Sequence, residues 1–327
     1  MASYAETGHA NVLTAVTDGA PDIADIDGPP EGYTWEDISY VVGGFNWKAH
    51  FIDNEGYLIT GDGTQYNLYN RLFDLGDEWV AYHAGEEGAR AEYTCGSCHT
   101  TGYVPLGHQN NMPGIVGQWA EDGVGCEACH GPGGNHVNDP YLVAMEVETD
   151  SRLCLDCHVR SETSEIVSAG TLISHTVDYQ APQAAKHRVT DCVTCHDPHM
   201  NTVHQRGNPV KVECESCHLD KAQNTKFASF RHASCTDCHM PNLMTAAVAT
   251  SHSGDVSSHL MSINPSQIEQ FTADGVFTQP YLSLNTACRG CHSEDGFATP
   301  LSDEALMEMA TGYHDPDLAN TVRNSRQ

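Results

Sequence analysis

Basic residues are scarce in this chain of 327 residues. Only 15 Lys and Arg stand against 44 Asp and Glu, which gives a formal net charge of -29 at pH 7. Nucleic acids and anionic membranes are themselves polyanions, so a surface this acidic makes both of them poor partners. The sequence also lacks any apolar run of about 18 residues, the length that a transmembrane helix needs. We therefore expect no nucleic-acid partner and no membrane span.

Apolar residues are also fewer than an ordinary globular core requires. The hydrophobic set makes up 39% of the chain, and it includes 14 Cys. Without those Cys, the apolar share falls below the usual range for globular proteins. The abundant residues are instead Cys and His, of which there are 14 and 20.

All of the cysteines fall into Cys-x-x-Cys pairs, and a His follows each pair directly. The motifs are Cys95, Cys98 and His99; Cys126, Cys129 and His130; Cys154, Cys157 and His158; Cys192, Cys195 and His196; Cys214, Cys217 and His218; Cys235, Cys238 and His239; and Cys288, Cys291 and His292. This is the attachment signature of c-type haem. The two thiols form thioethers with the porphyrin edge, and the His is the proximal ligand of the iron.

Three other interpretations fit the motifs less well. Structural zinc sites usually combine two Cys-x-x-Cys knuckles, and an odd number of pairs does not suit them. A thioredoxin-like redox motif would occur once, and a disulfide framework would not need a His after every pair. The pattern therefore predicts seven covalently bound haems, with no Cys left for a disulfide.

Covalent haem attachment in bacteria and archaea is completed outside the cytoplasm, so we expect an exported protein, extracellular or at the cell surface, with the periplasm as the alternative. The first residues show no charged segment followed by an apolar one, as a signal peptide would. We interpret the sequence as a mature form from which the export signal has been removed.

The motifs start at residues 95, 126, 154, 192, 214, 235 and 288, a spacing too irregular for a solenoid repeat. The chain is also too short to build a separate core around each of seven haems. We therefore predict a fold that is mostly irregular, with short α-helices around a packed haem array in residues 95–327. Residues 300–314 have apolar side chains at helical spacing and predict a C-terminal helix that opens at Ser302 or Asp303.

Residues 1–94 contain no motif and predict a haem-free N-terminal arm with a small β-rich module. Short strands are expected at 38–42, 47–52 and 57–60, with a turn at 53–56. The first thirty residues are predicted to form an extended arm.

A second axial ligand closes a haem iron to substrates and favours electron transfer. After the proximal ligands are assigned, 13 His remain. A His close to a motif cannot easily reach the far face of its own haem, but it can reach the next haem. The predicted distal ligands are His136, His187, His199, His232, His259, His314, His175 and His9. The thioethers of Met200 and Met240 are the alternative ligands.

The segments around these motifs, such as Cys126–His136, Cys192–His199 and His232–Pro241, resemble those of bacterial and archaeal multihaem c-type cytochromes. Within that class, the chain is most similar to extracellular cytochromes that polymerise into conductive filaments, or nanowires. The resemblance implies bis-His haems, self-association into a filament and redox partner proteins or extracellular electron acceptors. It also makes His9 a candidate for ligation in a neighbouring subunit.

These patterns favour long-range electron transfer without an enzymatic activity. The alternative is a multihaem oxidoreductase with one open-site haem that acts on a small nitrogen or sulfur compound. Such enzymes often replace one motif His with Lys, and no such replacement occurs here. The carboxylates Asp22, Asp25 and Asp27 are candidate weak sites for Ca²⁺, although such runs are usually solvated surface.

Overall fold

The computed structural model describes residues 2–21, 26–45, 47–73, 75–158, 168–169, 172–174, 187, 190–200, 210–223 and 233–317. The chain divides into two compact units. The first comprises Met1–Cys157 and Cys195–Pro209, and the second comprises His158–Thr194 and Val210–Gln327.

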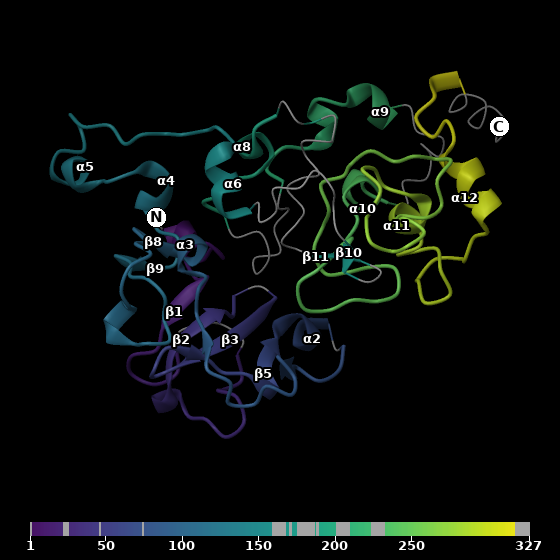
Figure 1. The fold of residues 1–327 in the computed structure, drawn as a ribbon. Coiled ribbons are helices and arrows are strands. Elements are labelled where there is room, and N and C mark those ends of the chain that lie inside the picture. The colour runs from purple at the N-terminus through teal and green to yellow at the C-terminus, as the bar shows by residue number, and fades with distance from the viewer. Residues whose placement is uncertain are drawn as a thin grey trace. The chain divides into compact units, whose positions relative to one another are not determined.

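A seven-stranded antiparallel sheet forms the haem-free part of the first unit (Figure 1). Its strands are β1 (Leu13–Ala15), β2 (Ile38–Gly43), β3 (Lys48–Asp53), β4 (Tyr57–Leu58), β5 (Gly61–Asn67), β6 (Trp79–Tyr82) and β7 (Ala91–Glu92). The order is β1-β2-β3-β4-β7, and β5 joins β3 to β6. The predicted β-rich module is therefore confirmed, with the turn between β3 and β4 where it was expected.

Both faces of this sheet are buried, because successive side chains of a strand point to opposite faces. Val41 and Phe51, both fully buried, pack in one core with Ile38, Tyr66 and Trp79. Their neighbours on the opposite face, Tyr40 and Ile52, pack in a second core with Leu13, Tyr93, Ile115 and Trp119. The second core continues past residue 94, so the haem-free module and the first haem motif share one hydrophobic interior.

The first residues differ from the predicted extended arm. Residues 2–5 form helix α1 (Ala2–Ala5), and β1 pairs with β2, with Leu13 opposite Val42. Leu13 is only 1% exposed and Thr7 only 2%. Burial of Leu13 in the second core holds this segment against the sheet, although a three-residue strand leaves little pattern in the sequence.

The remaining elements are short. The first unit also contains η1 (Trp35–Asp37), α2 (Leu68–Phe73), η2 (Gln109–Asn111), α5 (Gly134–Asn138) and the pair β8 (Thr100–Thr101) and β9 (Glu121–Asp122). The second contains α9 (Leu219–Gln223), α12 (Asp303–Ala310) and a sheet of β10 (Ser168–Ala169), β11 (Leu172–Ser174) and β12 (Met244–Thr245). The predicted fold class, mostly loop with short helices, is confirmed.

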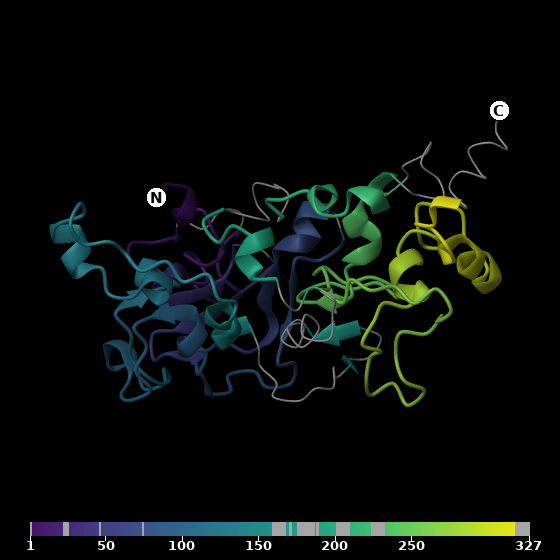
Figure 2. The same ribbon diagram turned by 90° about the horizontal axis from the view of Figure 1, so that it is seen from above.

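A small core of Leu172, Leu243, Met244, Leu260 and Leu282 holds the second unit together. Helix α12 packs beside α11 (Leu284–Cys288) (Figure 2). The N-cap of α12 is Ser302, whose hydroxyl accepts a hydrogen bond from the Ala305 amide, as the sequence predicts. Across the described ranges, every helix is too short or too polar to cross a membrane.

Candidate haem-binding sites

Each Cys-x-x-Cys-His motif lies on, or next to, one short helix. The attachment helices are α3 (Gly96–His99), α4 (Cys126–His130), α6 (Arg152–His158), α8 (Cys192–Cys195), η3 (Cys214–Ser216), α10 (Cys235–His239) and α11 (Leu284–Cys288). In three motifs the His amide donates to the carbonyl of the first Cys: His99 to Cys95 at 3.2 Å, His218 to Cys214 at 2.9 Å and His292 to Cys288 at 2.8 Å. One helical turn thus brings both thiols of a motif to one side of the helix.

Helix α10 shows how the local sequence starts such a turn. The Ser234 hydroxyl accepts a hydrogen bond from the Asp237 amide, and the Asp237 carboxylate accepts one from the Ser234 amide at 2.7 Å. This capping box satisfies two backbone donors that the helix would otherwise leave unpaired. Asp237 lies between the two cysteines of the sixth motif, so a variable position of the motif fixes the start of its own helix.

The structure brings three proximal histidines against three predicted distal ones. The rings of His130 and His199 lie 6.0 Å apart between centroids, with 11° between their planes. The rings of His239 and His314 lie 6.1 Å apart at 27°. Those of His187 and His218 lie 5.7 Å apart, with their Nε2 atoms 3.4 Å from each other. Each pair joins a motif to a residue outside that motif.

In five of the motif histidines and candidate distal histidines, the ring nitrogen Nδ1 faces a backbone carbonyl. The contacts of Nδ1 with a carbonyl oxygen are those of His130 with Glu146 (2.7 Å), His239 with Met261 (2.7 Å), His292 with Thr299 (2.8 Å), His136 with Val143 (2.6 Å) and His314 with Lys221 (3.1 Å). A carbonyl accepts only from a protonated nitrogen, so Nδ1 carries the proton and Nε2 is left with its lone pair. This is the arrangement that proteins use to orient a metal-binding imidazole.

The pair of His187 and His218 fits an iron between the two rings. A bond between a metal and an imidazole nitrogen is about 2 Å long, so two axial nitrogens on one metal lie about 4 Å apart. The 3.4 Å between the Nε2 atoms of His187 and His218 is close to that separation. Two such atoms share at most one hydrogen bond, whereas a metal ion engages both lone pairs. Two thiols and one imidazole are the groups that a haem c site needs, and the second imidazole would close its iron.

Cysteines of different motifs lie close together within each unit. In the first unit, Cys157 contacts Cys98 and lies near Cys129. Burial, and to a lesser extent the charge of Cys98, raises the pKa of the Cys157 thiol. In the second unit, burial raises the pKa of Cys238 to about 11, with further contributions from Asp237 and Cys291. The first three motifs therefore converge in one unit, and the last two converge in the other.

The remaining predicted distal ligands have different surroundings. His136 is half-buried on α5, and His259 is half-buried between the fully buried Ser258 and Leu260. Desolvation by the surrounding chain lowers the pKa of His9. The His9 ring donates a hydrogen bond to the carbonyl of Pro198, which opposes this shift. His175 and His232 lie outside the described residues. Iron ligation stays a prediction for these five residues, as it does for His187, His199 and His314.

One contact at the second motif left no signal in the sequence. The ring of Tyr4 lies 6.0 Å from that of His199, between centroids, at 60°. The Tyr4 hydroxyl donates to the carbonyl of Val124, two residues before Cys126. A lone Tyr close to the N-terminus has no recognisable pattern, so only the tertiary structure identifies it.

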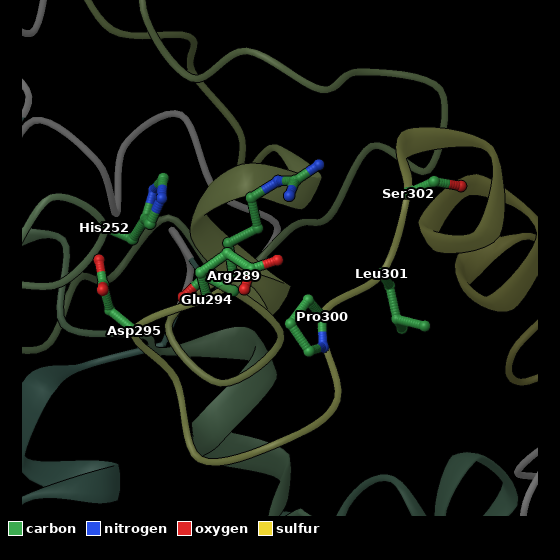
Figure 3. A pocket seen from close by; sticks show the side chains of 8 residues that line it. His252, Arg289, Glu294, Asp295, Pro300, Leu301 and Ser302 are labelled. Atoms are coloured by element: carbon green, nitrogen blue, oxygen red, sulfur yellow. The ribbon is translucent and has the colours of Figure 1, made fainter.

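A pocket of about 420 Å³ opens beside the seventh motif (Figure 3). His252 and Asp295 line one side, Leu301 and Ser302 line the other, and Arg289 lies between them. The Arg289 guanidinium is bound by Asn285 at 2.7 Å and by the Asp303 carboxylate. Since Glu294 also lines it, the pocket is predominantly acidic.

Two family models match the region of the first three motifs. Residues 78–131 match the family described as cytochrome c554 and c-prime, and residues 119–163 match the doubled CXXCH motif. Residues of the chain are also 28% identical, over 135 positions, to the multihaem cytochrome MtrA of Shewanella baltica (strain OS185). That match covers 37% of this chain and 36% of MtrA, so the chain spans about a third of the length of this relative.

Solved structures of multihaem cytochromes share the fold over nearly the whole chain. The outer cell wall cytochrome OcwA superposes with a TM-score of 0.63 at 16% identity, covering 99% of this chain and 95% of OcwA. The chain is a multihaem c-type cytochrome.

Two further structures have the fold of this cytochrome. The undecahaem cytochrome from the S-layer of Carboxydothermus ferrireducens has a TM-score of 0.54 at 15% identity, covering 98% of this chain and 66% of its own. The octahaem sulfite reductase MccA of Wolinella succinogenes has a TM-score of 0.55 at 16% identity, covering 99% and 69%. The fold is thus shared by an outer cell wall cytochrome and a sulfite reductase, and it does not by itself identify the role of this cytochrome.

Proposed function

We propose that the cytochrome transfers electrons over a long range through seven covalently bound haem c groups, one at each motif. The observation that carries this proposal is the set of three histidine pairs, with ring centroids 5.7, 6.0 and 6.1 Å apart. Two axial imidazoles leave an iron without a position for a substrate, which suits electron transfer.

The residues of the chain have separate tasks in this proposal. The two Cys of each motif anchor the haem, and the following His is its proximal ligand. His187, His199 and His314 would hold the iron together with His218, His130 and His239 and so close it to substrates. When bound, the haem supplies the one-electron chemistry, while the chain sets the spacing, burial and hydrogen bonding that tune it.

The proposal extends to location and assembly. We propose an extracellular or cell-surface position and self-association into a filament. The filament would exchange electrons with redox partner proteins or extracellular acceptors. The class of the protein supports this proposal. OcwA is an outer cell wall cytochrome, and the undecahaem cytochrome comes from an S-layer. The periplasm is the alternative location.

Spectroscopy of the purified holoprotein tests the central proposal. We expect seven haems per chain by mass, a fully low-spin oxidised spectrum, and no carbon monoxide binding after reduction. A stoichiometric high-spin haem, or carbon monoxide binding to one haem per chain, would contradict pure electron transfer. Negative-stain microscopy of the same material tests the filament separately.

The alternative function, reduction of a small nitrogen or sulfur compound at an open haem, has the fold of MccA in its favour. The charged residues that line the pocket at the seventh motif make it unfavourable for an anionic substrate. Its guanidinium is paired with Asp303, and its other charged residues include Glu294 and Asp295. Carbon monoxide binding in the experiment above is the result that would favour this alternative.

A further inference from the structure

The N-terminal segment contacts both sides of the second haem motif. On the proximal side, the Tyr4 hydroxyl donates to the Val124 carbonyl, and the Val124 amide donates to the His9 carbonyl at 2.9 Å. Val124 precedes Gly125, the N-cap of the attachment helix α4. The segment is therefore bonded to the start of the helix that carries Cys126, Cys129 and His130.

The packing at this junction is close. A Cβ on Gly123 would come within 2.3 Å of the Ala10 carbonyl oxygen, and Gly123 has a φ of +73°. The Thr101 hydroxyl donates to the Gly123 carbonyl at 2.9 Å and accepts from the Gly125 amide at 2.6 Å. Residues 123–125 are thus fixed from two directions, and the N-terminal segment has a rigid surface on which to lie.

On the distal side, the same segment contacts the loop that carries His199. The Tyr4 ring packs at 60° against the His199 imidazole, and His9 donates to the carbonyl of Pro198. Besides the rings of Tyr4 and His130, the His199 ring contacts the Asp197 carboxylate, which lies 3.1 Å from Nδ1. Asp197 is close to His199 in the sequence and the contact is exposed, whereas Tyr4 links His199 to the segment that precedes α4.

We propose that Tyr4 is a positioning residue for the second haem, holding the His199 imidazole nearly parallel to that of His130. This inference rests on the proposed function, because it takes His130 and His199 as the axial ligands of one iron. Tyr4 suits the role because one rigid side chain reaches from the His199 ring to the Val124 carbonyl. The hydrogen bond to Val124 fixes the hydroxyl end to the segment before α4, and the ring limits the rotation of His199.

Electron paramagnetic resonance of the oxidised holoprotein tests this role, because the low-spin signal of a bis-His haem depends on the angle between the two imidazole planes. His199→Ala first identifies the second haem as the one whose low-spin signal is lost. In Tyr4→Ala we expect that same signal to shift or broaden, together with a shift in the reduction potential of that one haem. The other low-spin signals are expected to stay as in the wild type.

Two further variants separate positioning from general destabilisation. Tyr4→Phe keeps the ring against His199 and loses only the hydroxyl contact, so we expect a smaller shift of the second-haem signal than in Tyr4→Ala. Tyr141→Ala removes a Tyr that is 97% exposed in the same unit, and it should leave every signal unchanged.

The outcomes distinguish this inference from the proposal on which it rests. If His199→Ala creates no high-spin haem, His199 is not an axial ligand and both ideas are wrong. If His199→Ala does so, but the second-haem signal in Tyr4→Ala matches that in Tyr141→Ala, only the positioning role is overturned.

Discussion

At the scale of the residue, Nδ1 orients several of the histidines that we propose as axial ligands, although Nδ1 of His187 is buried without a hydrogen-bond partner. A backbone carbonyl that accepts from Nδ1 fixes the tautomer and turns Nε2 toward the iron. His130 obtains this carbonyl from Glu146, 16 residues later in the chain, and His314 obtains it from Lys221, which precedes it by 93. The ligands are therefore oriented by the backbone of distant segments.

Removing single distal ligands should change one haem at a time. We expect His187→Ala and His314→Ala each to convert one of seven ferric haems from low-spin to high-spin, because the iron loses its sixth ligand. Optical spectra and carbon monoxide titration measure the fraction. The control is His83→Ala, since the His83 side chain is 46% exposed beside Glu86 and we assign it no ligand role. A second high-spin haem in either ligand variant would show that the paired haems are not independent.

The motifs themselves could be predicted residue by residue, because thioether attachment requires a local spacing. His187 and His199 could be singled out as distal ligands because they lie beside the fourth motif. Their partners could not be predicted, since His199 faces His130 of the second motif and His187 faces His218 of the fifth. Such pairings depend on long-range packing, and a surplus of 13 histidines leaves many combinations open.

At the scale of the element, the antiparallel sheet holds a histidine in its neutral form. His50 lies on β3, where its Nε2 is 2.6 Å from the Gln65 Oε1 and its ring stacks on Tyr82 at 3.9 Å. The Gln65 amide donates to Asn67 at 2.7 Å, which fixes its oxygen toward His50. Burial lowers the pKa of His50 to about 4; the Gln65 contact opposes this shift, and the charges of Lys48, His83 and His99 add to it.

This lowered pKa makes the sheet sensitive to acid. Between pH 6.5 and about 4, His50 takes up a proton in the unfolded chain and not in the folded one. The free energy of unfolding therefore falls as the pH falls through this window. His50→Gln removes this titration, so we expect the fall in the free energy of unfolding between pH 7 and pH 5 to be about 2 kcal/mol smaller than in the wild type. Urea unfolding followed by circular dichroism measures this difference. An unchanged difference between the two pH values would contradict the assignment.

The elements of the sheet were predictable where a strand alternates over five or six residues, as β2 and β3 do. Tyr40 and Val41 enter different cores, as do Phe51 and Ile52, and that alternation is visible in the sequence. The three-residue strand β1 was not predictable, because its place in the sheet depends on Leu13 reaching a core that also contains Ile115. The short attachment helices could be located only through their motifs.

At the scale of the whole molecule, the charge of -29 opposes self-association. Copies of the chain repel one another unless salt screens them or cations bind between them. The Debye length falls from about 30 Å at 0.01 M ionic strength to about 8 Å at 0.15 M. Residues 22–25, which include two of the carboxylates considered for Ca²⁺, lie outside the described residues. Elsewhere in the described chain, no group of three or more His, Cys, Asp or Glu is arranged to hold a metal ion.

We therefore expect assembly to increase as NaCl is raised from about 0.01 M to about 0.15 M ionic strength, as measured by light scattering and negative-stain microscopy. CaCl₂ at matched ionic strength distinguishes screening from specific binding. Equal assembly in the two salts indicates screening alone, whereas stronger assembly in CaCl₂, reversed by a chelator, supports a calcium site. Assembly that weakens with NaCl would contradict an interface limited by like charge.

The length of the attachment helices has a consequence for the biogenesis of the cytochrome. None of them exceeds the seven residues of α6, and isolated helices of that length are unstable in water. Among the described residues after Ile115, the small core around Leu260 and Leu282 is the one hydrophobic cluster that lies entirely in this part of the chain. The sheet, by contrast, is complete without any cofactor. We therefore expect maturation to start from a folded N-terminal sheet, with haem attachment making the remainder of the cytochrome compact.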